Sequence, residues 1–231
     1  MRKDDSWGKI KNYISSQRIE LGPYFTHNLL HAPRHLLFTF SRYKFAARLI
    51  GEFPKVNILE LGCNEGLGTL LLAENLHSVT AIDFDRDAIQ WAKSNLEKKD
   101  NIVFKYDDFL GKNYGKYDVV VALDVIEHIP KEQEIDFFRT LTSNLNDDGY
   151  CIIGTPNVTA SQYSSEPSKI GHVNLFSAER LKDTARQYFK NVFLFGMNDE
   201  VVHTGFYPMA HYLLALCCSK KHGASTPPHK E

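Results

Sequence analysis

Residues 58–68 read ILELGCNEGLG, an apolar run that leads directly into a turn with three glycines. The apolar run predicts a buried strand, and the residues after the glycines predict a helix. Glycine suits a turn in which the chain reverses sharply and its backbone approaches a ligand without a Cβ in the way. This stretch therefore predicts a strand, a ligand-binding turn and a helix, which is a unit of an α/β fold.

The order of the glycines indicates which ligand the turn suits. Gly62, Gly66 and Gly68 do not follow the Gly-x-Gly-x-x-Gly spacing of a nicotinamide dinucleotide site. Glu60, close before the first glycine, favours a ligand that bears an ammonium group over one that bears two phosphates. Asn64 tolerates left-handed backbone better than other non-glycine residues do. The turn is therefore predicted to bind a ligand with an amino-acid part rather than a pyrophosphate.

From residue 56 onward, short apolar runs alternate with longer helical patterns, which is typical of βαβ units and a parallel sheet. Strands are expected at residues 56–61, 78–83, 102–106, 117–123 and 150–154, with the last strands at 191–196 and 200–204. Helices are expected at residues 68–75, 87–98, 131–145 and 178–188. The pattern predicts an α/β fold with a doubly wound, mostly parallel sheet.

Three regions are expected along the chain. Residues 1–50 combine a helical pattern with scattered aromatic and histidine residues, which predicts a helical lid over the edge of the sheet. Residues 51–219 form the ligand-binding domain, and residues 220–231, which contain Gly, Ser, Pro and charged residues, are expected to be a disordered tail. The apolar stretch 207–218 is interpreted as a core helix or strand, with a membrane or partner contact as the alternative.

Composition argues against several classes of protein. The sequence has 27 Lys and Arg against 28 Asp and Glu, so it lacks the basic excess of many nucleic-acid binders. Its four cysteines show no Cys-x-x-Cys spacing, which indicates reduced thiols rather than a zinc ribbon or a disulfide framework. The sequence shows no signal-peptide pattern and no apolar run of bilayer length. A cytoplasmic protein is expected, and its oligomeric state, monomer or homodimer, stays open.

The second and third expected strands end in acidic residues. Asp83 follows Gly62 by 21 positions, and an acidic side chain there can accept hydrogen bonds from both hydroxyls of a ribose. Phe84 can lie against an adenine face, and Asp108 or Asp107 can accept a hydrogen bond from the exocyclic amine. Together with the glycine turn, these residues predict a pocket for adenosine joined to an amino acid.

A second polar group follows the fourth and fifth expected strands. Asp124, Glu127 and His128 come directly after the fourth strand, and a helical turn there would place Asp124 near the other two. His128 is a natural general base for a hydroxyl, because the unperturbed pKa of histidine is close to physiological pH. His172, beyond the fifth strand, can point back over the same edge. Two carboxylates and two imidazoles in one pocket would suit Mg²⁺, Mn²⁺ or Zn²⁺.

The combined motifs resemble the class I S-adenosylmethionine-dependent methyltransferases over roughly residues 40–190. The first motif of that family, Asp/Glu-x-Gly-x-Gly-x-Gly, is met at Glu60, Gly62, Gly66 and Gly68, with Asn64 where many members have glycine. The resemblance implies a Rossmann-like, seven-stranded fold and S-adenosylmethionine as cofactor. The expected cofactor contacts are Arg42, Glu60, Gly62, Asn64, Gly66, Asp83, Phe84, Asp107, Asp108, Phe109 and Leu123.

A narrower resemblance concerns the reaction side. Asp124, Glu127, His128 and the distant His172 are similar to the Glu-x-x-Glu-His pattern and later His of ubiquinone-pathway O-methyltransferases and small-RNA terminal 2′-O-methyltransferases. Aspartate here replaces the first glutamate. The resemblance implies catalytic roles for Asp124, His128 and His172, and a metal held by all four residues. It also implies that Arg42 contacts the carboxylate of the cofactor.

These observations predict a methyltransferase that moves a methyl group to a hydroxyl, or an amine, of a small acceptor such as a sugar or phenol. One alternative is a metal-dependent RNA 3′-terminal 2′-O-methyltransferase, which the neutral charge balance disfavours. The other is an NAD-dependent dehydrogenase or epimerase, or a cofactor-binding module without catalysis. The glycine order disfavours the dinucleotide version, as does the lack of a suitably placed Tyr-x-x-x-Lys pair.

Overall fold

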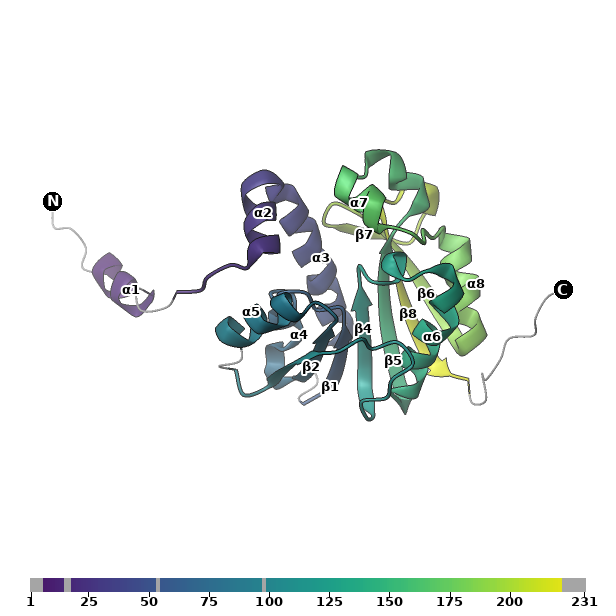
Figure 1. Cartoon of the computed structure of the whole chain (residues 1–231), viewed down its shortest axis with the longest axis horizontal. Helices are drawn as coiled ribbons and strands as arrows, with labels where there is room; N and C mark the ends of the chain where they lie inside the picture. The colour runs from purple at the N-terminus through teal and green to yellow at the C-terminus, as the bar shows by residue number, and fades with distance from the viewer. Residues whose placement is uncertain (1–5, 15–17, 53–54, 97–98, 222–231) are drawn as a thin grey trace.

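The fold is built on one sheet of eight strands in the order β3-β2-β1-β4-β5-β8-β6-β7 (Figure 1). The structure is a computed structural model that describes residues 6–14, 18–52, 55–96 and 99–221. The strands are β1 Asn57–Leu61, β2 Ser78–Asp83, β3 Ile102–Tyr106, β4 Tyr117–Leu123, β5 Leu145–Pro156, β6 Phe189–Asn198, β7 Val201–His203 and β8 Tyr212–Lys220. Strands β1 to β5 pair in parallel, and β8 runs antiparallel between β5 and β6.

Helices lie along both faces of this sheet. The α-helices are α1 Ser6–Ile14, α2 Pro23–His31, α3 Pro33–Ile50, α4 Thr69–Leu72, α5 Arg86–Leu96, α6 Glu134–Ser143, α7 Glu166–Gly171 and α8 Ala178–Tyr188. Short 3₁₀ turns are η1 Glu74–Leu76, η2 Ile126–His128, η3 Lys131–Gln133, η4 Val158–Tyr163 and η5 Tyr207–Met209. Helices α3, α4 and α5 supply residues to one core, and α6 and α8 supply residues to the other.

Two cores form because neighbouring residues of a strand point to opposite faces of the sheet. In β4, Val119 and Val121 pack with α3 and α5, whereas Val120 and Ala122 pack with α6 and α8. All four side chains are buried, which explains why β4 reads as a continuous apolar run rather than an alternating one. The doubly wound α/β sheet predicted from the sequence is therefore confirmed.

The order of the strands changes at β1 and β4, which are parallel neighbours in the sheet. From β1 the chain adds β2 and β3 on one side, and it then returns to add β4 and β5 on the other. In an open α/β sheet, ligands bind in the crevice outside the carboxyl ends of the strands at such a point. The glycine turn follows β1, and the segment from Asp124 to His128 follows β4. The topology thus brings the glycine turn expected to bind the cofactor and the polar residues expected on the reaction side to the same crevice.

Several boundaries differ from those expected. The helix expected at 68–75 is shorter, because α4 ends at Leu72 and Asn75 adopts a left-handed backbone with φ of 55°. The helix expected at 131–145 is α6, which stops before Leu145 because that residue pairs with Tyr117 in the sheet. The apolar stretch 207–218 contributes most of β8, an internal strand of the sheet, which confirms its interpretation as core. The sheet has eight strands rather than seven, because the short β7 adds a hairpin to β6.

The N-terminal region is helical, as expected, but its helices differ in burial. Every residue of α1 is exposed, whereas α3 buries Leu36, Tyr43, Ala46 and Ile50 against the sheet. The expected disordered tail begins at residue 220, which is the last residue of β8, and residues 222–231 lie outside the described residues. In the part of the chain that the structure describes, no helix is long and apolar enough to cross a membrane.

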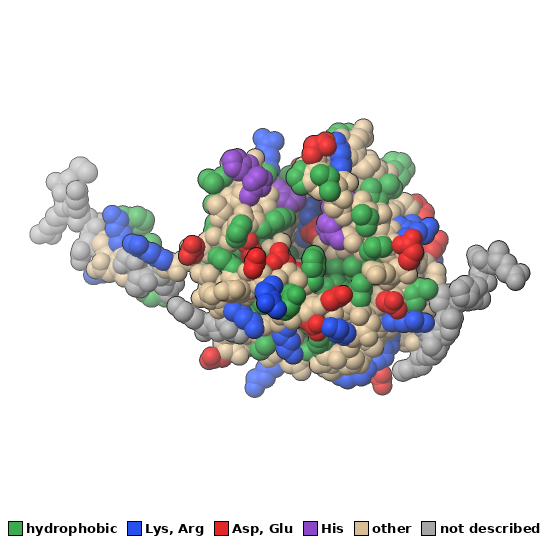
Figure 2. All heavy atoms as spheres, in the orientation of Figure 1, with side chains coloured by type: hydrophobic (Ala, Val, Ile, Leu, Met, Phe, Trp, Pro, Cys, Tyr) green, Lys and Arg blue, Asp and Glu red, His purple; other side chains and the backbone are tan. Residues whose placement is uncertain are grey.

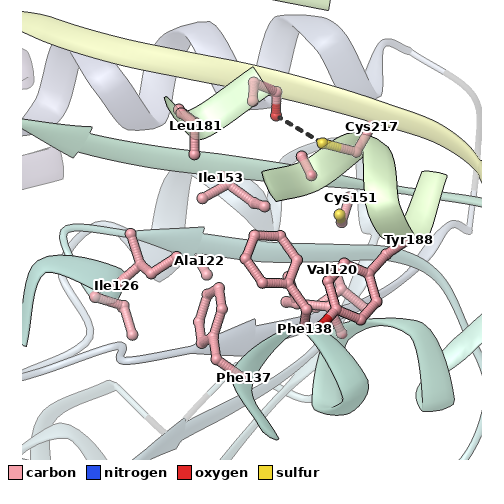
Figure 3. Packing of buried hydrophobic residues seen from close by; sticks show 14 of the residues in the cluster. Val120, Ala122, Ile126, Phe137, Phe138, Cys151, Ile153, Leu181, Tyr188 and Cys217 are labelled. Atoms are coloured by element: carbon pink, nitrogen blue, oxygen red, sulfur yellow. Dashed lines mark hydrogen bonds between the residues drawn. The ribbon is translucent and has the colours of Figure 1, made fainter. Parts of the chain in front are cut away.

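Truncation of Phe138 should reveal how much the α6–α8 core contributes to stability. The Phe138 ring is fully buried and stacks on Tyr188 with ring centroids 4.8 Å apart (Figure 3). Phe138→Ala is expected to lower the free energy of unfolding by about 3–5 kcal/mol, measured by urea denaturation, because it leaves a cavity in a packed core. Phe193→Ala is the matched control: its ring is 54% exposed, and we expect a loss below about 1 kcal/mol.

Candidate active site

The glycine turn after β1 has the left-handed backbone that its sequence suggests. Gly62 and Gly66 both have φ of 77°, and Asn64 between them has φ of 49°. A Cβ added to Gly62 would lie 2.4 Å from Cγ2 of Val125, so both the conformation and the space require glycine there. Because Val125 belongs to the segment after β4, this contact also joins the two sides of the crevice.

Asp83, at the end of β2, holds the turn from the neighbouring strand. Its Oδ2 accepts the backbone N–H of Asn64 at 2.7 Å, and its Oδ1 accepts that of Asp85 at 2.9 Å. Burial raises the pKa of Asp83 above its ordinary value, while these hydrogen bonds lower it. Each carboxylate oxygen can accept a further hydrogen bond. The side chain can therefore order the turn and still bind two ribose hydroxyls.

The residues expected around an adenine differ in what they can offer. Phe84 is 71% exposed, so its ring is free to cover an adenine face. Asp107 is engaged by Lys112 and by the Tyr114 hydroxyl, and the hydrogen bond from Lys112 lowers the pKa of Asp107. Asp108 is exposed and accepts only the N–H of Leu110 among the described residues, which favours it over Asp107 as the partner of an exocyclic amine.

Two other expected contacts belong to the cores. Phe109 is 4% exposed, and its ring packs in the core beneath α6. Its carbonyl oxygen accepts the Thr140 hydroxyl and the Lys112 N–H, so its backbone N–H is the group left for a cofactor among the described contacts. Leu123 is 3% exposed and packs against Gly154 at the end of β4. Both residues shape the floor of the crevice.

Glu60 lies beneath the turn, and its carboxylate faces the protein. Its Oε1 accepts the Tyr43 hydroxyl at 2.7 Å, and its Oε2 accepts the Thr69 hydroxyl at 2.6 Å. Burial raises its pKa to about 7, although the two hydrogen bonds lower it. Tyr43 also lies against Gly68, where an added Cβ would be 2.3 Å from the ring. Glu60 thus ties α3 and α4 to the first strand.

The raised pKa of Glu60 predicts a pH-dependent contribution to stability. The folded chain keeps this proton up to about pH 7, whereas the ordinary pKa is 4.5, so the unfolded chain loses it earlier. The contribution is therefore complete below pH 4.5 and is lost as pH rises through about 7. Relative to Glu60→Gln, the wild type should lose at most about 3 kcal/mol over that range, measured by urea unfolding at several pH values. Glu74→Gln, at an exposed position, should show no such trend.

Across the crevice, Glu127 in η2 is fully buried. Its Oε2 accepts the Thr155 hydroxyl at 3.0 Å, and its Oε1 has no hydrogen-bond partner among the described residues. Burial, together with the nearby charge of Asp124, raises the pKa of Glu127. A buried oxygen without a partner is costly, which suggests that a further group completes this site.

Two histidines flank Glu127. Nδ1 of His128 lies 2.9 Å from the carbonyl oxygen of Gly171, which leaves its Nε2 available. The His172 ring lies 5.0 Å from the His128 ring, and its Nδ1 is buried without a partner in the described part of the chain. Burial lowers the pKa of His172. One ligand atom from each of Glu127, His128 and His172 lies within 4.8 Å of the others, so these three residues form a compact cluster.

Asp124 lies outside this cluster. Its Oδ1 forms an ion pair with Arg42 at 2.6 Å, and the Arg42 guanidinium stacks over the Tyr212 ring at 4.0 Å. The left-handed backbone of Asp124, with φ of 58°, separates it from the 3₁₀ turn that follows. Nε of Arg42 is buried and finds no partner among the described residues, so one donor of the guanidinium can still bind a ligand.

Four contributors were not anticipated from the sequence. Tyr43 supports Glu60, Thr155 supports Glu127, and Gly171 orients His128. Tyr212, from β8, stacks on Arg42. Each acts on a site residue from another element, so local spacing carried no signal for it.

On the surface, histidines lie on both sides of the hollow between the α2–α3 end and the α7 end of the molecule (Figure 2).

Comparison with known proteins identifies the family. A family profile described as a methyltransferase domain matches residues 25–189. The chain is 31% identical over 139 residues to the ubiquinone biosynthesis O-methyltransferase of Rickettsia akari, a match that covers 59% of this chain and 54% of that protein. The chain thus spans about half the length of the curated relatives it matches.

Solved structures share the fold. The methyltransferase domain of bacterial CtHen1-C superposes with a TM-score of 0.65 at 15% identity, covering 78% of this chain and 98% of that one. The N-methyltransferase NodS from Bradyrhizobium japonicum, in complex with S-adenosylhomocysteine, gives 0.56 at 18% identity, covering 81% and 85%. S-adenosylmethionine is the cofactor of this family. The chain belongs to the class I S-adenosylmethionine-dependent methyltransferases and is related to the ubiquinone biosynthesis O-methyltransferase group.

Proposed function

We propose that this protein transfers the methyl group of S-adenosylmethionine to a hydroxyl of a small acceptor, with a phenol as the first candidate. The cluster of Glu127, His128 and His172 beside the cofactor turn is the observation that supports this best. Relatives named as O-methyltransferases support a hydroxyl over an amine. The cofactor in this proposal lies on the glycine turn, with its ribose on Asp83 and its adenine between Phe84 and Asp108.

Methyl transfer requires mainly positioning. The sulfonium of S-adenosylmethionine carries its own leaving group, so the protein must align the acceptor oxygen with the methyl group and exclude water. The acceptor oxygen also loses a proton as the new carbon–oxygen bond forms. Nε2 of His128 or Nδ1 of His172 can take that proton, because neither nitrogen has a hydrogen-bond partner among the described residues.

The same cluster fits a divalent metal. Glu127 Oε1 and His172 Nδ1 are buried with no hydrogen-bond partner among the described residues, and the carbonyl of Gly171 orients His128 as metal-bound histidines are usually oriented. When bound, such a cation would lower the pKa of the acceptor hydroxyl. Two imidazoles with one carboxylate favour Zn²⁺ or Mn²⁺ over Mg²⁺. Because Asp124 is paired with Arg42, we propose three protein ligands rather than four.

Arg42 and Asp124 have a different role in this proposal. The ion pair places one buried cation at the carboxyl edge of β4, and the free Nε of Arg42 can donate to the carboxylate of the cofactor. Asp124 then keeps the guanidinium in place. Both residues would hold the cofactor rather than take part in proton transfer.

The proposal is tested by incubating the full chain with S-adenosylmethionine and a panel of acceptors. The panel contains a catechol, an aliphatic sugar, an amino sugar and a short RNA duplex, and S-adenosylhomocysteine formation is the readout. We expect turnover with the catechol. Turnover only with the amino sugar would contradict O-methylation. Salt-sensitive turnover only with RNA would support the terminal 2′-O-methyltransferase alternative, which the same acid and histidine cluster keeps open.

A further inference from the structure

Glu65, in the cofactor turn, contacts a helix that is distant in sequence. Its Oε1 accepts the backbone N–H of Tyr24 at 2.7 Å, and its Oε2 accepts that of Phe25 at 3.1 Å. These are among the first N–H groups of α2, which have no partner within a helix. Gly22, at the N-cap position, has no side chain that could cap them. Glu65 therefore caps α2 from the cofactor turn.

The contact between Glu65 and α2 is closely packed. A Cβ added to Gly22 would lie 2.2 Å from Cδ of Glu65, although the Gly22 backbone, with φ of −70° and ψ of 173°, is open to any residue. The carboxylate of Glu65, and not the backbone, therefore requires glycine at position 22. Glu65 is 2% exposed, and a carboxylate removed from water depends on the hydrogen bonds and the helix N-terminus that replace its hydration.

On one side, hydrogen bonds connect this contact to Asp83, the residue proposed to bind the ribose. Asp83 accepts the N–H of Asn64 at 2.7 Å, and the side chain of Asn64 accepts the N–H of Glu65 at 2.6 Å. A ligand that orders Asp83 and the turn therefore also restricts the position of the Glu65 carboxylate. The turn and the first residues of α2 form one hydrogen-bonded unit.

On the other side, α2 brings side chains toward the reaction side of the crevice. The Tyr24 hydroxyl lies 3.4 Å from Nε2 of His35, which belongs to α3. Phe25 stacks on Phe40 of α3 with ring centroids 6.3 Å apart. When α2 is in place, Tyr24 therefore lies against His35, which shares one face of α3 with Arg42 because the two residues are seven positions apart.

We infer that Glu65 is a positioning residue that couples occupancy of the cofactor turn to docking of α2, and so to completion of the acceptor side. This inference rests on the proposed function, because it takes S-adenosylmethionine to bind at the turn. Coupling between two equilibria is reciprocal, so a cofactor that favours the docked helix must bind more tightly when the helix is docked. Cofactor binding then increases the fraction of molecules in which the acceptor site is complete.

The test uses the full chain, S-adenosylhomocysteine as the probe and amide hydrogen exchange of residues 24–31. In the wild type, saturating probe is expected to slow exchange of these amides about tenfold or more. In Glu65→Ala, exchange without probe should be about tenfold faster than in the wild type, since the cap is lost, and the probe should no longer slow it. Probe affinity, measured by calorimetry, should fall by no more than the factor by which the probe slows exchange of α2 in the wild type. Glu74→Ala, at an exposed position after α4, should behave as the wild type.

A second variant separates this coupling from general destabilisation. Gly22→Ala should loosen α2 because its methyl group displaces the Glu65 carboxylate, but it should add nothing in the Glu65→Ala background, where the space is free. Additive effects would contradict the inference, as would equal protection of α2 by the probe in wild type and Glu65→Ala. Probe binding without any protection of wild-type α2 would overturn this inference alone. Absence of probe binding to the wild type would overturn it together with the proposed function.

Discussion

Replacing Asp83 with alanine is expected to weaken binding of S-adenosylhomocysteine by about two orders of magnitude or more, measured by isothermal titration calorimetry. Two hydrogen bonds from ribose hydroxyls to an ionised group are lost, each contributing about 1.5–3 kcal/mol. The turn also loses the acceptor that holds the Asn64 N–H at 2.7 Å, so the backbone that approaches the cofactor is less ordered. The loss of affinity should therefore exceed that of a simple truncation at the rim.

Two controls define this result. Asp87→Ala removes an exposed carboxylate from the first turn of α5, four residues away in sequence, and should leave affinity within about threefold. Asp83→Asn keeps one acceptor oxygen and should give an intermediate loss. If Asp83→Ala bound the probe as tightly as the wild type while remaining folded, the ribose would have to lie elsewhere, and the assignment of the cofactor turn would be wrong.

The parts of the site that sequence patterns could predict are local. The glycine turn is encoded within eleven residues, and the left-handed backbone of Gly62, Asn64 and Gly66 follows from residue type. Strand ends follow from where apolar runs stop, so the sequence pattern alone suffices to place Asp83 at the edge of the sheet. Parallel topology then brings successive strand ends together.

The rest depends on contacts between distant segments. Arg42 and Asp124 are 82 residues apart, and Glu65 and Tyr24 are 41 apart, so no spacing in the sequence signals either pair. The position of Asp124 was expected from a helical turn shared with Glu127 and His128. Its backbone is left-handed instead, which turns the carboxylate toward Arg42 and leaves a cluster of three.

The helix and strand boundaries that differ from those expected also result from contacts between distant segments. Leu145 continues a helical pattern in the sequence, but pairing with Tyr117 places it at the start of β5. The stretch that became β8 was ambiguous between helix and strand, because a short apolar run that is buried on both faces has no diagnostic period. Tertiary pairing decided the conformation in both segments.

The largest effect on turnover is expected from His172. His172→Ala should lower the rate of S-adenosylhomocysteine formation with a catechol acceptor by about 10²–10⁴-fold, the range for removal of a positioned acid or base. His211→Ala is the matched control, since His211 is exposed and lies beside Tyr163 rather than in the cluster. Probe affinity should stay nearly unchanged in both variants, because neither residue contacts the proposed cofactor site.

The shape of the pH profile tests why His172 is suited to this role. Burial lowers the pKa of His172 below its ordinary 6.5, so the imidazole is neutral at pH 7 and can accept a proton or hold a metal. In the wild type, turnover should rise with pH through that lowered pKa and then level off. Chelator treatment followed by Mn²⁺ or Zn²⁺ separates the two roles, because a metal site requires restoration of turnover by the cation, whereas a simple base does not. If His172→Ala retained full turnover both after chelator treatment and after addition of the cation, the unpartnered Nδ1 of His172 would have no role in catalysis. Proton transfer would then have to be assigned to His128 alone.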